Sequence, residues 1–335
     1  MNTLYIIGNG FDLAHGLKTS YSDFLLWYLK DCGQKKLYNT NFNDELIKLE
    51  GWGHFGDLHE IENIKDLIEL FKYNNITFKQ TGTFIRNIYL HEHDHNWVDI
   101  ESWYFRVLLS CSKNDPNKEA KEIKVLNHQL NLLKLKLEEY LISLDKNIIH
   151  NKEIQSHFSQ GNRRTNNKSL ALNFNYTSTV ENYLKKSLTS KIINIHGQLG
   201  DTENPIIFGY GDEMHHDYES IERLDIDEYL INFKSFGYLR NSNYSFFDSF
   251  INVGEFNVKI LGHSCGLSDR VLLSTIFQHE NCKKIEICYH KTSESENDHY
   301  EKTIKISRHF STAMKAKMRS KIIPKNKSKP LCTPQ

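Results

Sequence analysis

The chain has 335 residues, of which 39% are hydrophobic and 25% charged, a composition ordinary for a globular protein with a sizeable core. Lysine plus arginine and aspartate plus glutamate each number 42, so the net charge is zero and a uniformly basic, nucleic-acid-coating surface is excluded. Six scattered cysteines form no C-x-x-C pair, which argues against a zinc ribbon or a disulfide framework. With neither a leader-like segment nor an apolar run of about 18 residues, the sequence predicts a cytoplasmic protein.

Six short apolar runs predict the strands of the fold. They lie at residues 4–7, 170–173, 192–195, 206–208, 258–261 and 285–289. None alternates cleanly between apolar and polar residues, which is typical of strands buried on both faces of a parallel sheet. After the first run, Ser20 and Asp23 have the spacing of a capping box at the start of a helix. The expected fold class is therefore α/β, with a mostly parallel, Rossmann-like sheet.

A long segment between the first and second of these runs predicts a helical insertion. Leucine and isoleucine recur every three or four residues from about 120 to 144, which indicates one amphipathic helix. Residues from about 35 to 165 carry no convincing strand pattern. We expect a single α/β nucleotide-binding domain over residues 1–310, interrupted by this insertion.

The C-terminal residues are strongly basic. No acid follows Glu301, whereas ten lysines or arginines do, and seven of these lie within residues 315–329. We expect residues 311–335 to form a flexible tail that binds phosphates in a salt-sensitive way.

Gly8-Asn9-Gly10 directly follows the first apolar run. A strand that ends in Gly-x-Gly lets the backbone approach a pyrophosphate at the start of the next helix. The full dinucleotide fingerprint is absent, because Leu13 stands where its third glycine belongs. On spacing alone, a tight turn without a ligand is an equal alternative.

Three further polar clusters follow later apolar runs. Asn173 to Thr177 and the pair His196-Gly197 end two of them, and ligands of open α/β sheets bind at such strand ends. Gly262-His263-Ser264-Cys265-Gly266 has the spacing of a hydrolase nucleophile elbow. The pattern lacks a convincing acid and histidine downstream, so a loop around a ribose or a phosphate is the other reading.

His91, His93 and His95 form a separate cluster with several carboxylates. Their spacing suits metal ligands on a strand or loop. An exposed, histidine-rich loop without a metal is the simpler interpretation, and Asp99 would then cap the helix that follows.

Together these segments resemble the AbiH family of bacteriophage abortive-infection proteins. The matching stretches span nearly the whole chain and comprise residues 8–12, 15–19, 21–24, 97–101, 173–177, 196–197 and 262–264. The resemblance implies a role in antiviral defence in which infection shuts down the host cell.

A more distant resemblance is to sirtuin-like NAD-binding proteins, which have similar motifs in the same order. It implies that Asn175 positions the ribose or water, that His196 is the base, and that Asp12 or His15 lies beside the ribose or nicotinamide. Its implied nucleotide-binding residues are Gly8, Asn9, Gly10, Phe11, Tyr176, Thr177, Gly197, Gly262, His263, Ser264 and Asp269. The chain departs from the sirtuin pattern at Asn9 to Asp12 and at Thr177, and it lacks the zinc cysteines of deacetylases.

The resemblance predicts an enzyme that cleaves NAD, or a related nucleotide, at its N-glycosidic bond, with no cofactor besides NAD as substrate. One alternative is a nucleotide or nucleic-acid sensor whose basic tail engages nucleic acid. Another is a nuclease that uses Asp12, His15, Asp99 and Glu101 with a divalent metal. No membrane partner is expected, and a homo-oligomer is compatible with the sequence.

Overall fold

The computed structural model describes residues 1–37, 41–51, 53, 56, 58–80, 97–113, 116–144, 148–158, 167–184, 190–291, 293 and 296–333. The chain divides into two compact units. Unit 1 comprises residues 1–17, 145–215 and 233–335, and unit 2 comprises residues 18–144 and 216–232. Among the helices in these ranges, none combines the length and apolar character needed to cross a membrane.

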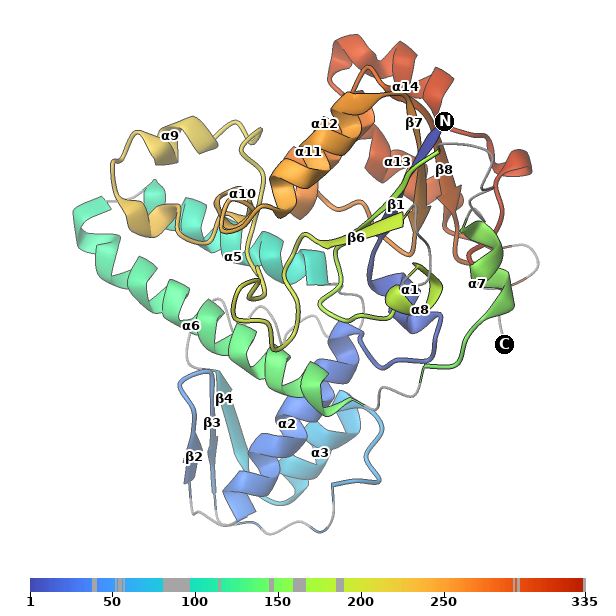
Figure 1. The fold of residues 1–335 in the computed structure, drawn as a ribbon. Coiled ribbons are helices and arrows are strands. Elements are labelled where there is room, and N and C mark those ends of the chain that lie inside the picture. The colour runs from blue at the N-terminus through green and yellow to red at the C-terminus, as the bar shows by residue number, and fades with distance from the viewer. Residues whose placement is uncertain are drawn as a thin grey trace. The chain divides into compact units, whose positions relative to one another are not determined.

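Unit 1 is built on a five-stranded sheet with the order β6-β5-β1-β7-β8, in which every neighbouring pair is parallel (Figure 1). The strands are β1 (Asn2–Ile7), β5 (Ser169–Asn173), β6 (Ser190–Asn194), β7 (Phe256–Leu261) and β8 (Cys282–Cys288). The predicted α/β class with a mostly parallel, Rossmann-like sheet is confirmed. Five of the six apolar runs form these strands.

Side chains of the central strand alternate between two cores, as expected for a sheet covered on both faces. Leu4 and Ile6 pack with apolar residues of α11 (Asn243–Val253), α12 (Arg270–Gln278) and α13 (His299–Ser307). Tyr5 and Ile7 pack on the other face with residues of α1 (Asn9–Leu13), α7 (Lys152–His157) and α8 (Glu181–Leu184). Burial on both faces explains why β1 reads as a continuous apolar run.

The sixth run, Ile206 to Phe208, is not a strand, so that prediction was wrong. Its backbone bonds the loop after β6 rather than a neighbouring strand, with the Ile207 N–H donating to the His196 carbonyl at 2.7 Å. All three side chains are nevertheless buried, and Ile207 packs in the core beside α11 and α12. The run is apolar because it covers this core, and a strand pairing is not required to explain it.

Unit 2 contains most of the expected insertion. Its helices are α2 (Tyr21–Leu37), α3 (Ile64–Tyr73), α5 (Trp97–Ser112), α6 (Pro116–Ser143) and α9 (Tyr218–Glu222), with the 3₁₀-helix η1 (Asp227–Tyr229). The helix predicted over 120–144 corresponds to α6. The capping box is present, since the Asp23 N–H donates to Ser20 Oγ and the Ser20 N–H donates to Asp23 Oδ2.

The insertion also holds strands that we did not expect. A small antiparallel sheet has the order β2-β3-β4, with β2 (Asn41–Asn43), β3 (Ile47–Glu50) and β4 (Thr77–Gln80). Each strand has only three or four residues and includes lysine, asparagine or glutamine. Such short segments give almost no periodic signal.

The C-terminal residues pack against the sheet of unit 1, to which they belong, whereas we expected a flexible tail. They form η3 (Thr312–Met314), α14 (Lys315–Lys321) and η4 (Lys325–Lys327). Ile322 and Pro330 form single parallel bridges to Ile285 and Tyr289, along the outer edge of β8. Apolar side chains among these basic residues explain the packing, since Met314, Met318 and Ile322 lie against the core.

Two short helices of unit 1 lie near the site described below. They are α10 (Lys234–Gly237) and the 3₁₀-helix η2 (Leu267–Asp269), which precedes α12.

Candidate functional site

The strand order identifies the edge of the sheet where a ligand is expected. In chain order the parallel strands are arranged third, second, first, fourth, fifth, as in doubly wound nucleotide-binding sheets. The order reverses between β1 and β7, and ligands of such folds bind beyond the carboxyl ends of the strands at this point. The loops after β1, β5, β6 and β7 all leave the sheet at this edge, and they carry the predicted site residues.

The glycines after β1 and β7 allow two loops to cross at very short distance. A Cβ atom on Gly8 would lie 2.4 Å from His263 Cα, and one on Gly10 would lie 2.8 Å from the Gly262 carbonyl oxygen. Gly262 has φ +75°, and a Cβ there would lie 2.1 Å from the Phe11 nitrogen. This crossing requires glycine at all three positions whether or not a phosphate binds.

A first polar cluster surrounds Asp12 on α1, and we call it the Asp12 cluster (Asp12, Asn175, Thr177 and Thr179). The Thr177 hydroxyl donates to Asp12 Oδ2 at 2.6 Å. Asp12 is 1% exposed, and burial raises its pKa to about 6, although hydroxyl and amide groups of Thr177, Thr179 and Asn175 act in the opposite direction. The second oxygen, Oδ1, is buried and lacks a hydrogen-bond partner of good geometry among the described residues.

The loop after β5 is braced so that it faces Asp12. The Asn175 N–H donates to Asn173 Oδ1 at 3.1 Å, and Asn173 Nδ2 donates to the Thr177 carbonyl at 2.9 Å. Asn175 Nδ2 donates to the Gly8 carbonyl at 3.1 Å, which ties this loop to the end of β1. These bonds explain why asparagines flank Phe174, since asparagine side chains readily bond the backbone within a turn.

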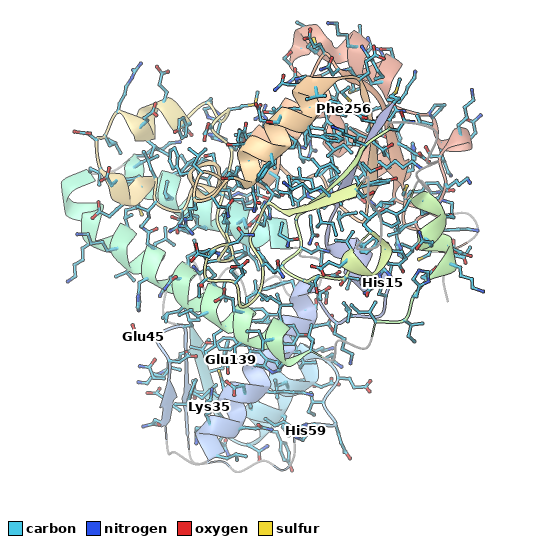
Figure 2. The ribbon with its side chains drawn as sticks, viewed as in Figure 1. His15, Lys35, Glu45, His59, Glu139 and Phe256 are labelled. Carbon is cyan, nitrogen blue, oxygen red and sulfur yellow. The ribbon has the colours of Figure 1, made fainter. Side chains whose placement is uncertain are left out.

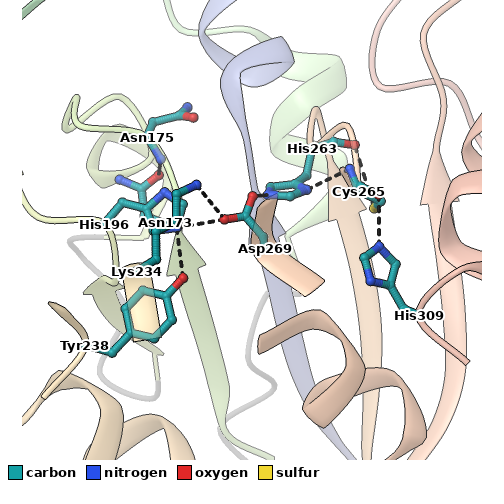
Figure 3. Close-up of polar contacts among 9 residues, drawn as sticks. All are labelled: Asn173, Asn175, His196, Lys234, Tyr238, His263, Cys265, Asp269 and His309. Carbon is teal, nitrogen blue, oxygen red and sulfur yellow. Dashed lines mark hydrogen bonds and ion pairs between the residues drawn. The ribbon is translucent and has the colours of Figure 1, made fainter. Parts of the chain in front are cut away.

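A second cluster, which we call the Asp269 cluster, comprises His196, Lys234, Tyr238, His263 and Asp269 (Figure 3). Asp269 Oδ1 lies 2.9 Å from Lys234 Nζ and 3.1 Å from His196 Nε2. All five residues are buried. Burial would raise the pKa of Asp269, but Lys234 and His196 outweigh it and hold that pKa well below the usual range. Burial and Lys234 lower the pKa of His196, against the opposing effect of Asp269.

His263 is held in one tautomer. The Cys265 N–H donates to His263 Nδ1 at 2.9 Å, so the ring proton lies on Nε2, which is 3.6 Å from Asp269 Oδ2. Burial lowers the pKa of His263 to about 3, so the ring is neutral at physiological pH. Cys265 itself has φ +55°, and its carbonyl accepts from His309 Nε2 at 2.9 Å. A buried chain of polar contacts therefore runs from Asp269 to His309 (Figure 3).

The two clusters meet at the loop after β5, because Asn175 belongs to one cluster and the adjacent Phe174 contacts the other. Asn175 lies beside Asp12 and bonds the Gly8 carbonyl, whereas His196 stacks on Tyr238, which packs in the core with residues of α11 and α12. The ring of Phe174 packs against two members of the Asp269 cluster, His196 and His263, with centroids 4.9 and 4.3 Å apart. Within the described ranges, no hydrogen bond joins Asn175 to His196.

The family comparison matches most of the chain. The profile described as "Bacteriophage abortive infection AbiH" matches residues 4–291. The chain belongs to the AbiH family. Membership associates it with abortive infection by bacteriophage, as the resemblance predicted. A comparison with curated proteins and another with solved structures gave no match.

His15, labelled in Figure 2, directs its ring at α8. Its Nδ1 donates to the Phe11 carbonyl at 2.6 Å, and its Nε2 lies 2.6 Å from the Tyr183 hydroxyl of α8. Burial lowers the pKa of His15. These contacts join α1 to α8, and they use both ring nitrogens.

The other predicted residues have varied surroundings. Asn9 begins α1, and Phe11 packs in the core beside α7 and α8. The Tyr176 hydroxyl donates to the Ile207 carbonyl, and Gly197 has φ +88° where the Pro205 carbonyl approaches it. Ser264 is half-buried in the loop after β7.

The residues predicted as metal ligands are only partly covered by the described ranges. His91, His93 and His95 lie outside the described residues, as does the side chain of Asp99. Glu101 is buried in unit 2.

Sequence reasoning missed Lys234, Tyr238 and His309. Lys234 is the only cation within 4 Å of Asp269 in the described residues apart from the two histidine rings. Lys234 begins the short helix α10, which carries no recognisable motif, and a single lysine is not by itself a signal of a site. An apolar segment that contains a lone lysine, such as Phe233 to Gly237, is the only signal that the sequence offers.

Proposed function

We propose that this AbiH protein hydrolyses the N-glycosidic bond of NAD, or of a related nucleotide, during phage infection. The observation that carries the proposal is the buried Asp12 carboxyl group, whose Oδ1 has no hydrogen-bond partner of good geometry among the described residues. It lies at the ligand-binding edge of a sheet with the nucleotide-binding strand order. A ribose hydroxyl is a donor that would satisfy this oxygen.

The chemistry needs a negative charge close to the ribose. When the bond between ribose C1′ and the nicotinamide nitrogen breaks, its electron pair leaves with nicotinamide, and the ribose becomes an oxocarbenium ion. Water then forms the new bond to C1′ and releases one proton, so the products are nicotinamide, ADP-ribose and H⁺. A fixed carboxylate near the ribose stabilises the developing positive charge without rearranging.

Each cluster has a part in this proposal. Ionised Asp12 accepts a hydrogen bond from a ribose hydroxyl, and Asn175 beside it orients the ribose or the attacking water. His196 takes the proton of the water, as the sirtuin resemblance implies, and Asp269 stabilises the imidazolium that forms. Phe174 precedes Asn175 in the chain and its ring packs against His196 and His263, so the loop after β5 contributes to both clusters.

The test incubates the purified chain with NAD and follows nicotinamide and ADP-ribose by chromatography. Asp12→Asn and Asn175→Ala should each lower turnover by about 10²–10⁴-fold, the usual range for a positioned catalytic group. Asp248→Asn, an exposed position on α11, is the matched control and should retain full activity. Turnover of NAD that survives both Asp12→Asn and Asn175→Ala would refute the assignment.

His196→Asn tests the second cluster by itself. The amide preserves a polar side chain near Asp269 but cannot accept the proton, so turnover should fall by a similar factor. Parallel incubations with RNA and with DNA, each with and without magnesium, complete the design. Magnesium-dependent loss of nucleic acid without release of nicotinamide would favour the nuclease alternative instead.

A further inference from the structure

The basic C-terminal segment, residues 315–329, is fixed in place by two of its own lysines. Lys321 is buried, and its Nζ donates to the carbonyls of Phe277 and His279 at 2.9 and 2.8 Å, at the end of α12. Lys315 Nζ donates to the Ser307 carbonyl and hydroxyl at the end of α13. These two cations therefore have structural partners.

The other five cations of the segment point into solvent. Lys317, Arg319, Lys325, Lys327 and Lys329 are all exposed. No carboxylate in the described part of the chain forms an ion pair with any of them. Because no acid occurs after Glu301, the segment itself supplies no neutralising charge. The result is a local excess of positive charge on a chain whose net charge is zero.

Attachment to the sheet matters for binding, because it reduces the entropy lost when a partner engages the lysines. The Ile323 N–H donates to the Ile285 carbonyl, and the Leu331 N–H donates to the Tyr289 carbonyl. Lys325, Lys327 and Lys329 lie between these two attachment points. Their backbone is therefore held at both ends, and only their side chains need to be ordered.

We infer that this segment binds the sugar-phosphate backbone of nucleic acid, through Lys325, Lys327 and Lys329 with Lys317 and Arg319 beside them in sequence. Regularly spaced cations in a segment without acidic residues suit a polymer of phosphates, because binding releases the counterions of the polymer. The inference is independent of NAD cleavage, since it concerns a different part of unit 1.

An anionic membrane is the competing partner, and the apolar residues argue against it. Segments that bind membranes place apolar side chains into the lipid next to their cations. Here Met314, Met318 and Ile322 pack against the core, and Leu331 is buried in the core on the other face of the sheet. The first three of these side chains are partly buried against the core, and the fully exposed side chains of residues 315–329 are charged or small.

The experiment measures binding of the full chain to a fluorescein-labelled single-stranded DNA of mixed sequence by anisotropy, over a series of salt concentrations. The variant carries Lys325→Gln, Lys327→Gln and Lys329→Gln. Its control carries Lys65→Gln, Lys72→Gln and Lys121→Gln, three exposed lysines of unit 2, so that the change in charge is the same.

We expect the control to bind like the unchanged chain and the C-terminal variant to bind at least about tenfold more weakly at low salt. The slope of log affinity against log salt should fall by about 2 in magnitude, at about 0.7 for each cation lost on a single strand. RNA and duplex DNA should also bind the C-terminal variant more weakly than the control, with a fall in slope of about 2.7 on the duplex, at about 0.9 for each cation.

Equal weakening of both variants would overturn the inference, because only total charge would then matter. Binding to vesicles that contain anionic lipid without binding to DNA would overturn it as well, as would equally tight binding to polyglutamate. Asp12→Asn should leave DNA binding unchanged, so failure of this inference and failure of the proposed NAD cleavage can be told apart.

Discussion

Replacing Asp12 by asparagine should make the protein more stable at neutral pH, although it removes a proposed catalytic group. Burial raises the pKa of Asp12 from 3.8 to about 6. Folding therefore favours the protonated carboxyl group, and this contribution to stability is complete below about pH 4 and lost as the pH rises through about 6. Asparagine has no proton to lose, so the variant should not show this decrease.

The magnitude follows from the two pKa values. Their difference, from 3.8 to about 6, is about 2.2, and one pKa unit corresponds to about 1.4 kcal/mol. The full effect is therefore about 3 kcal/mol, of which about 2 kcal/mol falls between pH 4.5 and 7.5. Relative to the unchanged protein, Asp12→Asn should gain that amount over this interval.

Urea unfolding followed by far-UV circular dichroism measures the prediction at pH 4.5 and at pH 7.5. The free energy of unfolding is compared for the unchanged protein, Asp12→Asn and the exposed control Asp248→Asn. The control should follow the unchanged protein at both pH values. If the gap between Asp12→Asn and the unchanged protein differs by less than about 0.5 kcal/mol between the two pH values, the carboxyl group is not a destabilised buried acid.

Two further substitutions test the packing of the site. Gly10→Ala should lower the free energy of unfolding by about 1–3 kcal/mol, because its Cβ would lie 2.8 Å from the Gly262 carbonyl oxygen. The control Gly254→Ala, whose Cβ would meet open space, should change this free energy by less than about 0.5 kcal/mol. Equal effects of the two substitutions in urea unfolding would contradict the crossing of the two loops. Asp269→Asn leaves the buried Lys234 charge without its carboxylate and should cost about 3–5 kcal/mol. Adding Lys234→Met should recover part of this loss in the same assay, and no recovery would show that the ion pair is not what matters.

The sheet was predictable because a strand that is buried on both faces has apolar residues at nearly every position. Strands such as β1 and β7 must be apolar on both sides, so they appear as continuous apolar runs. The same signal occurs at Ile206, where a segment outside the sheet covers the core and is equally apolar. Burial can be recognised from composition, but hydrogen-bond pairing between segments distant in the chain cannot.

The site could be predicted only in part, for a related reason. Asp12 and Asn175 lie within short motifs at strand ends, so the general rule for parallel sheets brought them together. Lys234 and His309 come from segments without a motif, and only the folded chain brings them to Asp269 and Cys265. That Asn175 and His196 have different partners is likewise not contained in the order of motifs along the chain.

The attachment of the C-terminal residues to β8 has a consequence for how the protein behaves in solution. β8 is the last strand of its sheet, and an uncovered edge strand offers unpaired N–H and C=O groups to other chains. The bridges at Ile322 and Pro330 occupy part of that edge, and the exposed lysines between them repel a second copy of the chain. Removing these residues would uncover a hydrophobic strand together with part of the core beneath Met318. A truncated chain should therefore self-associate through β8. In the full chain, the basic segment should prevent this pairing between copies.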